Sequence, residues 1–298
     1  MNVRRGRHFL QIPGPSNVPD RILRAMDRPT IDHRGPDFAV LGKRVLERIK
    51  PVFGVKASQV LIYPASGTGA WEAALVNALS PGDRVIMCET GQFASLWREV
   101  ATRFGIEVEM IPGDWRRGAD AGAIAKQLAA DTAHAVKAVC VVHNETSTGT
   151  VSDIAAVRRV MDAAKHPALL MVDTVSSLGS LRYCHDDWGV DVTVSASQKG
   201  LMLPPGISFN AVSAKAVAAG KQAKTARSYW DWGAMIKANA DGYFPYTPST
   251  NLLYALDEAL LMMEEEGLDQ VFARHDRLAE ATRRAATAWG LELQCAVP

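Results

Sequence analysis

Apolar and polar positions alternate along this chain in two patterns, one typical of strands and one of helices. Strand-like runs, either alternating or continuously apolar, lie at 60–63, 84–88, 106–111, 136–142, 168–173, 190–196 and 207–212. Helical patterns lie between them at 70–79, 93–104, 121–130 and 153–165. Strands that alternate with helices are typical of an α/β protein with a mostly parallel sheet. The nearly continuous apolar run 136–142 predicts a strand covered on both faces.

The last part of the chain follows a different pattern. Two long helices are predicted at 251–266 and 268–289, separated by the helix breaker Gly267. Residues 291–297 then alternate like a strand for which the sequence offers no partner. Because a lone strand cannot form a stable sheet, we expect the chain to be a fragment, or another chain to complete its last layer.

Composition and charge narrow the class of protein. The 298 residues are 48% apolar and 22% charged, enough for a large core in one big domain with part of another. The 33 basic and 32 acidic residues are well mixed, so no electrostatic footprint for nucleic acid or anionic lipid is expected. No run of about 18 apolar residues and no signal peptide is visible. The sequence predicts a soluble, cytoplasmic protein without membrane or nucleic-acid partners.

Cysteine and histidine usage gives no metal or disulfide signal. The four cysteines, at 88, 140, 184 and 295, are widely spaced and form neither a disulfide framework nor a zinc knuckle. The seven histidines show no His-x-x-x-His spacing. No metal site is therefore predicted.

Two strand ends carry the first candidate chemistry. The run 190–196 ends in small polar residues and then presents Lys199, and 26 positions earlier Asp173 ends the apolar run 168–173. Pyridoxal phosphate chemistry uses such a pair, a lysine for the aldehyde and an acid for the pyridine nitrogen. Taken singly, the lysine is more often a solvated surface charge and the aspartate a turn former or helix cap.

A third element strengthens the interpretation of the pair. The turn Ser66-Gly67-Thr68-Gly69 follows the strand 60–63 and opens the helix 70–79. Glycines let the backbone approach a ligand, and a helix N-terminus attracts phosphate. Such a turn is by itself usually only a helix cap. Together with the acid and the lysine it forms a candidate cofactor site.

Five motifs, in this order, carry a family resemblance. They are Pro13-Gly14-Pro15-Ser16-Asn17-Val18-Pro19, Ser66-Gly67-Thr68, His143-Asn144-Glu145-Thr146-Ser147-Thr148-Gly149, Val172-Asp173-Thr174-Val175-Ser176-Ser177 and Ser195-Ala196-Ser197-Gln198-Lys199-Gly200. The chain resembles the class V (fold type I) pyridoxal phosphate aminotransferases, in the alanine/serine–glyoxylate branch. The resemblance spans about residues 8–290. Residues 243–251 resemble the serine–glyoxylate members most.

The resemblance implies a domain organisation. Residues 1–20 would form an N-terminal arm, and 21–250 the large cofactor-binding domain with a mostly parallel seven-stranded sheet flanked by helices. Residues 251–298 would lead through long helices into an incomplete small C-terminal α+β domain.

The resemblance also implies site residues. Lys199 would be the Schiff-base lysine and proton shuttle, and Asp173 would keep the pyridine nitrogen protonated. Gly67, Thr68 and Gln198 would contact the phosphate, and Thr247 would do so from a neighbouring subunit, which implies a homodimer with shared active sites. The remaining implied positions are Ser66, Thr146 and Val175 at the cofactor, Gly14 at the substrate, and Phe93 over the pyridine face.

Two of these assignments carry an alternative. Phe93 could equally be a core aromatic residue, and Gly14 could also serve a rigid N-terminal turn. His143 lies near the implied site, but a histidine at a strand end is more often a structural residue, so it is left out of the catalytic set.

The implied reaction is transamination from a small L-amino acid to glyoxylate, giving glycine and a 2-oxo acid. Serine is the preferred donor, with alanine and aspartate open. One family feature has no match: no arginine here corresponds to the one that pairs with the substrate carboxylate. If the chain is truncated, we expect it to hold the cofactor but to transaminate poorly.

Two functions of a different kind stay open at this point. The first is a lyase of the same fold, such as a cysteine desulfurase, which needs a reactive cysteine. The second is a non-enzymatic nucleotide-binding domain, for which the sequence lacks the glycine-rich fingerprint.

Overall fold

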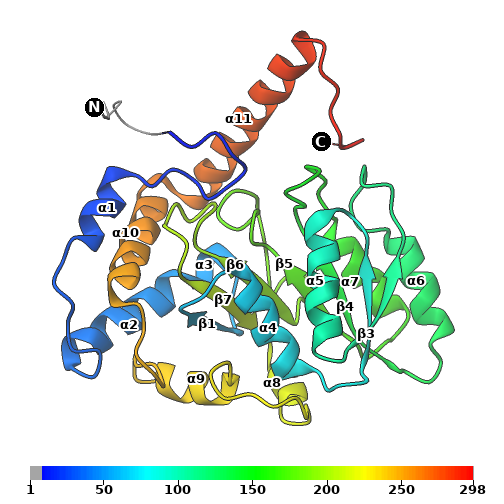
Figure 1. Cartoon of the computed structure of the whole chain (residues 1–298), viewed down its shortest axis with the longest axis horizontal. Helices are drawn as coiled ribbons and strands as arrows, with labels where there is room; N and C mark the ends of the chain where they lie inside the picture. Colours follow the sequence, from blue (N-terminus) through cyan, green and yellow to red (C-terminus); the bar gives the residue numbers. More distant parts are fainter. Residues whose placement is uncertain (1–8, 298) are drawn as a thin grey trace, which may run out of the picture.

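The protein is built on one central sheet (Figure 1). The structure is a computed structural model that describes residues 9–297. Its seven strands lie in the order β1-β7-β6-β5-β4-β2-β3. Their bounds are β1 (Gln59–Tyr63), β2 (Arg84–Cys88), β3 (Glu107–Ile111), β4 (Val136–Val142), β5 (Leu169–Asp173), β6 (Val192–Ala196) and β7 (Ser208–Val212). Only β7 runs antiparallel to its neighbours, which are β1 and β6. The predicted α/β class with a mostly parallel seven-stranded sheet is confirmed.

Helices cover both faces of this sheet and enclose two apolar clusters. In β4, Cys140 faces one cluster while its neighbours Val139 and Val141 face the other, which explains the continuous apolar run. One face is covered by α4 (Gly67–Ala78), α5 (Gln92–Arg103), α8 (Ala214–Gly220) and α9 (Trp232–Asn239). The other is covered by α1 (Asp20–Met26), α2 (Pro36–Arg48), α3 (Lys50–Phe53), α6 (Ala121–Ala130), α7 (Ile154–Ala163) and α10 (Thr250–Glu266).

The two predicted long helices behave differently from each other. Helix α10 packs against α1 and α2 and contributes Leu253, Leu256 and Leu260 to the core. Helix α11 (Leu268–Ala288) extends away from the body of the molecule (Figure 1). Among its residues only Val271 and Phe272 are buried, and both lie in its first turns. The proposed domain boundaries stay predictions.

The predicted strand at 291–297 is wrong. These residues form no strand, although the main-chain N–H of Ala296 donates to the Arg116 carbonyl at 2.7 Å and the Gln294 amide to the Trp115 carbonyl at 3.2 Å. An alternating pattern becomes a strand only where a neighbouring strand satisfies its backbone, and the described residues offer none at this point.

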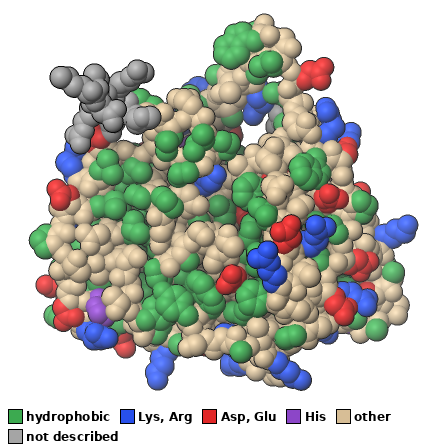
Figure 2. Space-filling model, in the orientation of Figure 1, with side chains coloured by type: hydrophobic (Ala, Val, Ile, Leu, Met, Phe, Trp, Pro, Cys, Tyr) green, Lys and Arg blue, Asp and Glu red, His purple; other side chains and the backbone are tan. Residues whose placement is uncertain are grey.

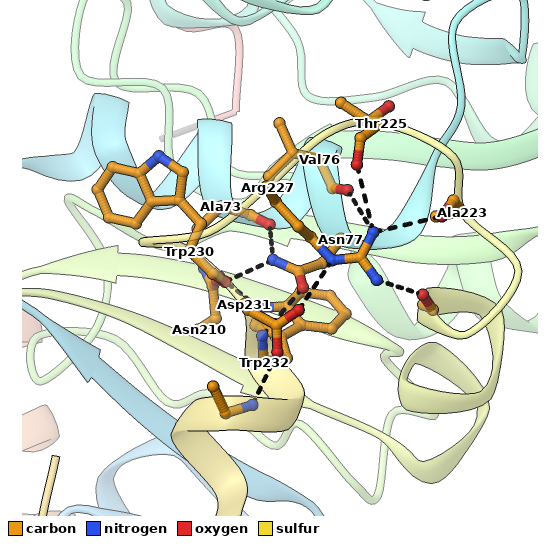
Figure 3. A network of polar contacts seen from close by, with 12 residues as sticks. Ala73, Val76, Asn77, Asn210, Ala223, Thr225, Arg227, Trp230, Asp231 and Trp232 are labelled. Carbon is orange, nitrogen blue, oxygen red and sulfur yellow. Dashed lines mark hydrogen bonds and ion pairs between the residues drawn. The ribbon is translucent and has the colours of Figure 1, made fainter. Parts of the chain in front are cut away.

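A polar network fixes α4, the helix whose first turn opens the candidate site (Figure 3). The buried Asn77 amide donates to the carbonyls of Ala73 and Trp230, and its oxygen accepts from the main-chain N–H of Trp232. The Asn210 side chain, from β7, donates to the Ala70 carbonyl in the first turn of α4. Because these amides are buried and bonded at both ends, they tie the helix to the sheet in one position.

Arg227 closes the same network from the loop between α8 and α9 (Figure 3). Its guanidinium donates to the carbonyls of Val76 and Gly220, near the carboxyl ends of α4 and α8. It also lies 3.4 Å from the Asp231 carboxylate. Carbonyls at helix ends lack partners within the helix, and a cation there satisfies them. The loop thereby holds α4 from its far end.

The distribution of charged side chains on the surface agrees with the nearly equal numbers of basic and acidic residues in the sequence. On the face seen in Figure 2, basic and acidic side chains are interspersed, with no continuous stripe of one sign. Within residues 9–297, no helix is both long and apolar enough to cross a lipid bilayer.

Candidate active site

A cavity of about 290 Å³ opens where the carboxyl ends of β4, β5 and β6 meet the first turn of α4. Ligands in open α/β sheets bind at this edge, outside the carboxyl ends of the strands. Ten of the residues predicted from the sequence line it: Gly14, Ser66, Gly67, Thr68, Phe93, Thr146, Asp173, Val175, Gln198 and Lys199. The fold therefore brings together residues from separate parts of the chain. Their individual roles stay predictions.

Asp173 ends β5 and lies at the floor of the cavity, with only 3% of its surface exposed. Its Oδ1 accepts the main-chain N–H of Val175 at 2.7 Å. Burial raises the pKa of this carboxyl from 3.8 to about 7, while hydrogen bonds from Val175 and Trp71 act in the opposite direction. A buried carboxylate without a cation beside it is costly, so the site favours a positively charged partner for Asp173.

Lys199 follows β6 and points into the same cavity. Its Nζ donates to the Pro13 carbonyl at 3.0 Å. Burial lowers the pKa of the amine, although the charge of Asp173 opposes this. A lowered pKa increases the fraction of neutral amine, which is the form that attacks an aldehyde.

The segment that contains Gly14 is hydrogen-bonded to the Lys199 region on both sides of this glycine, through Pro13 before it and Ser16 after it. The main-chain N–H of Ser16 donates to the Gln198 carbonyl at 2.8 Å, and its hydroxyl donates to the Lys199 carbonyl at 3.1 Å. Gly14 has a φ of +152°, and a Cβ built on it would lie 2.3 Å from Lys199 Nζ. The absence of a side chain at position 14 is therefore what leaves room for the lysine amine.

If Lys199 is the reactive amine that the sequence predicts, Gly14→Ala is expected to lower turnover about a hundredfold, because the methyl group must displace that amine and misplaced reacting groups cost about that much. The backbone strain should also cost about 1–3 kcal/mol of stability. Gly82→Ala is the matched control: Gly82 has a φ of +86° with open space around its Cα, so it suffers the strain without the collision. Kinetics and thermal unfolding of both variants would test this. Equal activity losses in the two would show that strain alone is responsible.

The first turn of α4 has the features of an anion site. Gly67 starts the helix, and its N-cap residue Ser66 makes no side-chain capping hydrogen bond to it. The helix N-terminus therefore presents main-chain N–H groups to the cavity. Gln198 also lines the cavity, and its amide NH₂ is the group that could donate to an anion there; its amide oxygen is buried without a hydrogen-bond partner among the described residues and calls for a donor instead.

Phe93 is placed by a buried carboxylate. Glu145 is fully buried and accepts the main-chain N–H groups of Phe93 at 3.2 Å and Ala94 at 3.1 Å, in the first turn of α5. It also binds the hydroxyl of Ser147 at 2.8 Å, which shapes the loop that carries Thr146. Phe93 is half-buried: it lines the cavity and also packs against the apolar core. The predicted cavity position and the alternative of a core aromatic residue therefore each describe part of its surroundings.

Six cavity residues were not predicted as site residues from the sequence: Pro15, Trp71, Val142, Asn144, Ser176 and Pro205. Asn144 and Ser176 bond each other across two loops, the Asn144 amide to the Ser176 hydroxyl at 2.9 Å and that hydroxyl to the Asn144 carbonyl at 2.7 Å. Both lie inside motifs that carry the family resemblance, and those motifs could have pointed to them. Trp71 donates its indole N–H to Asp173 Oδ2 at 2.6 Å, and no local pattern announces that contact.

Two further residues lie outside the cavity. His143 is buried beside Ser177, with its Nδ1 2.9 Å from that hydroxyl, and burial lowers its pKa to about 4. Thr247 is exposed and does not line the cavity of its own chain; its hydroxyl lies 3.4 Å from His33 Nε2. A contact to the phosphate of another subunit stays a prediction for this residue.

Comparison with known proteins decides the family. The model of the family described as aminotransferase class V matches residues 8–289. The chain belongs to this family. It is 50% identical to the serine–glyoxylate aminotransferase of Methylorubrum extorquens, over 97% of this chain and 73% of that one. It is 46% identical to the serine–glyoxylate aminotransferase of Arabidopsis thaliana and to the L-aspartate–glyoxylate aminotransferase of Paracoccus denitrificans, in each case over 96% of this chain and 72% of the relative.

The fold is shared with solved structures of aminotransferases. The alanine–glyoxylate aminotransferase of Nostoc sp. superposes with a TM-score of 0.90 at 30% identity, over 98% of this chain and 77% of that one. The pyridoxamine–pyruvate aminotransferase of Mesorhizobium loti does so with a TM-score of 0.88 at 28% identity, over 97% of this chain and 73% of that one. The chain is thus a pyridoxal phosphate-dependent aminotransferase of fold type I.

Family membership and cysteine geometry together disfavour the two functions of a different kind. A desulfurase needs a reactive thiolate at the site, but no cysteine of residues 9–297 lines the cavity. Burial raises the pKa of the Cys88 thiol to about 12 and that of Cys140 still further. A non-enzymatic nucleotide-binding domain does not fit membership of a class V aminotransferase family.

Proposed function

We propose that this class V enzyme transfers the amino group of L-serine to glyoxylate, giving glycine and the 2-oxo acid of the donor. The observation that carries the proposal is the cavity in which Lys199, Asp173 and the uncapped start of α4 meet. Two relatives at 46–50% identity are named for serine and glyoxylate. A third, at 46% identity, is named for aspartate, so the choice of donor is the part most in need of a test.

The residues present fit pyridoxal phosphate. Lys199 would hold the cofactor through its aldehyde, and the N-terminus of α4 with Thr68 and Gln198 would hold its phosphate. Asp173 is buried and favours a positively charged partner, so it would pair with the ring nitrogen. Phe93 and Val175 would supply apolar contact to the ring. When bound, the cofactor supplies an electron sink for the charge that develops at the amino acid's α-carbon.

The chain's own residues then divide the remaining work. Lys199 takes up the proton that leaves the α-carbon of the amino acid, because its partly buried amine is the basic group in the cavity. The Pro13 carbonyl orients that amine. Asp173 would keep the ring nitrogen of the bound cofactor protonated, because its negative charge pairs with the positive charge of that nitrogen. A cavity of about 290 Å³ that must also hold the cofactor favours a donor with a small side chain.

The proposal includes a homodimer with shared sites. Its support is Thr247, which is exposed and does not line the cavity of its own chain, and a group of exposed apolar side chains, among them Ile12, Leu23 and Val40. Scattered apolar residues are ordinary on a surface, but several on the N-terminal part of one molecule favour an interface. In such a dimer Thr247 would complete the phosphate contacts of the partner's cavity.

The experiment that tests the function is the half-reaction followed by visible absorbance. Protein loaded with pyridoxal phosphate is mixed in turn with L-serine, L-alanine and L-aspartate, and glyoxylate is added afterwards. We expect serine to convert the cofactor band fastest and glyoxylate to restore it. A faster conversion by aspartate or alanine would reassign the donor. A band that forms but ignores every amino acid would support a chain that holds the cofactor without transaminating.

A further inference from the structure

Trp71 makes a contact that the proposed chemistry does not yet use. It lies in the first turns of α4, is 4% exposed, and lines the cavity beside Asp173. Its indole Nε1–H donates to Asp173 Oδ2 at 2.6 Å, while the main-chain N–H of Val175 donates to Oδ1 at 2.7 Å. Each oxygen of this carboxylate thus receives one N–H, and Trp71 is the one donor of the pair that a substitution can remove.

The charges around Asp173 explain why the Trp71 N–H matters for the protonation state of this carboxyl. Burial and the nearby carboxylate of Glu145 both favour the protonated acid, and only Lys199 supplies an opposing charge. Two further titratable side chains lie close by, and burial keeps both neutral: Tyr183, whose pKa is raised, and His143, whose pKa is lowered. Besides the charge of Lys199, hydrogen bonds from Val175 and Trp71 to the ionised form are what the protein itself offers against the cost of burial.

A neighbouring tryptophan shows that packing alone does not explain the contact. Trp71 and Trp97 stack with ring centroids 5.9 Å apart and planes 10° from parallel. Trp97 is also buried, at 1% exposure, yet its Nε1 has no hydrogen-bond partner among the described residues. A phenyl ring could fill either place in the stack. Of these two stacked tryptophans, Trp71 is the one whose indole N–H reaches a polar partner within residues 9–297.

We propose that Trp71 is a positioning residue, which holds Asp173 ionised and in one orientation toward the ring nitrogen of the cofactor. The inference rests on the proposed function. It assigns to the first turns of α4 a second task besides holding the phosphate, since the same helix segment would then set the protonation of the ring. The hydrogen bond joins an indole and a carboxylate that are 102 residues apart in the chain.

The test compares Trp71→Phe with Trp97→Phe, which removes an indole N–H that has no hydrogen-bond partner within residues 9–297. Each protein is loaded with pyridoxal phosphate labelled with ¹⁵N in the ring, and the ¹⁵N chemical shift reports directly whether the nitrogen carries a proton. Cofactor affinity is measured by fluorescence titration. We expect Trp97→Phe to match the wild type. Trp71→Phe should bind the cofactor about tenfold more weakly, as expected for a lost hydrogen bond to a charged group, and should release the ring proton at lower pH.

The outcomes separate the inference from the proposed function. A wild type that binds no pyridoxal phosphate would overturn both. A wild type with a protonated ring nitrogen, matched by Trp71→Phe in shift, pH dependence and affinity, would overturn the inference alone. If Trp71→Phe does not fold, a benzothienylalanine at position 71 keeps the ring shape and removes only the N–H. With that analogue, an unchanged ¹⁵N titration would count against a role for the hydrogen bond.

Discussion

Replacing Lys199 by alanine is expected to lower turnover by about 10⁴-fold or more, because in the proposed function this one side chain serves both as the attachment point of the cofactor and as the base for the α-proton. The amine points into the cavity and donates to Pro13, and no other lysine of residues 9–297 lines that cavity. The visible band of a covalently attached cofactor should disappear, although the phosphate contacts remain. Steady-state kinetics and absorbance spectra measure both effects.

Two controls sharpen this prediction. Lys199→Arg keeps a cation but offers no nucleophilic amine, so it should be as inactive as the alanine variant. Lys221→Ala, at an exposed lysine after α8, should behave as the wild type. Partial recovery of Lys199→Ala by an added small amine would support the role as base. Normal turnover in Lys199→Ala would contradict the proposed function.

The Lys199→Ala variant can also test whether two chains share their active sites. If Thr247 serves the partner's cavity, a mixture of Lys199→Ala and Thr247→Ala chains forms heterodimers in which one of the two sites has both residues intact. At limiting cofactor, the mixture should then be more active than the sum of its components. A purely additive result would argue against shared sites.

Replacing Asp173 by asparagine is expected to lower turnover by about 10³-fold, a loss typical of removing a buried electrostatic stabiliser. An amide cannot hold the ring nitrogen in its protonated form, and its NH₂ would face one of the two N–H donors, Trp71 or Val175. Cofactor binding should weaken less than turnover falls. The ratio of the two effects, from kinetics and titration, measures the electronic role of the carboxylate.

The same substitution should change the pH dependence of stability in the cofactor-free protein. The pKa of Asp173 rises from 3.8 to about 7 on folding, so the folded protein binds an extra proton between these values. The carboxyl is neutral in both states below about pH 4 and ionised in both above about pH 7. Wild-type stability therefore falls as pH rises through this window, by roughly 4 kcal/mol, and Asp173→Asn removes that dependence.

Denaturant unfolding at pH 4 and pH 8 tests this sign directly. The stability of Asp173→Asn relative to the wild type should improve between the two pH values, while titrations of other groups cancel in the comparison. Asp191→Asn is the matched control, since Asp191 is also a buried aspartate but lies at the opposite edge of the sheet, where it accepts the main-chain N–H of Leu170. A relative stability of Asp173→Asn that stays constant with pH would show that the carboxyl is not held protonated.

The sequence predicts the sheet well because each central strand is apolar on two covered faces, as in 136–142. It predicts the cavity because motif residues follow strands whose carboxyl ends meet at one edge. It fails at 291–297, where alternation exists without a neighbouring strand. It also misses the short helices α1, α3, α8 and α9, whose few residues carry little periodicity. The 13-residue helix α2 is missed as well, although Phe38, Leu41 and Val45 form a buried face at helical spacing that could have predicted it.

The contact between Trp71 and Asp173 shows the limit of local reasoning. Both residues lie within or beside recognised motifs, but the bond depends on how α4 lies across the sheet. That placement is fixed by Asn77 and Asn210, two buried amides whose roles emerge only when distant segments pack together. Side-chain pairs of this kind are properties of the tertiary structure rather than of any window of sequence.

The one reversed strand, β7, acts as a spacer. It separates β1, which leads into the start of α4, from β6, which leads to Lys199. Neighbouring strands lie about 4.8 Å apart, so the ends of β1 and β6 are roughly 10 Å apart at the cavity edge. Backbone geometry, rather than side-chain length, therefore fixes the distance between the proposed anion-binding turn and the proposed nucleophile, Lys199. An insertion or loss of one strand here would change which molecules can reach both.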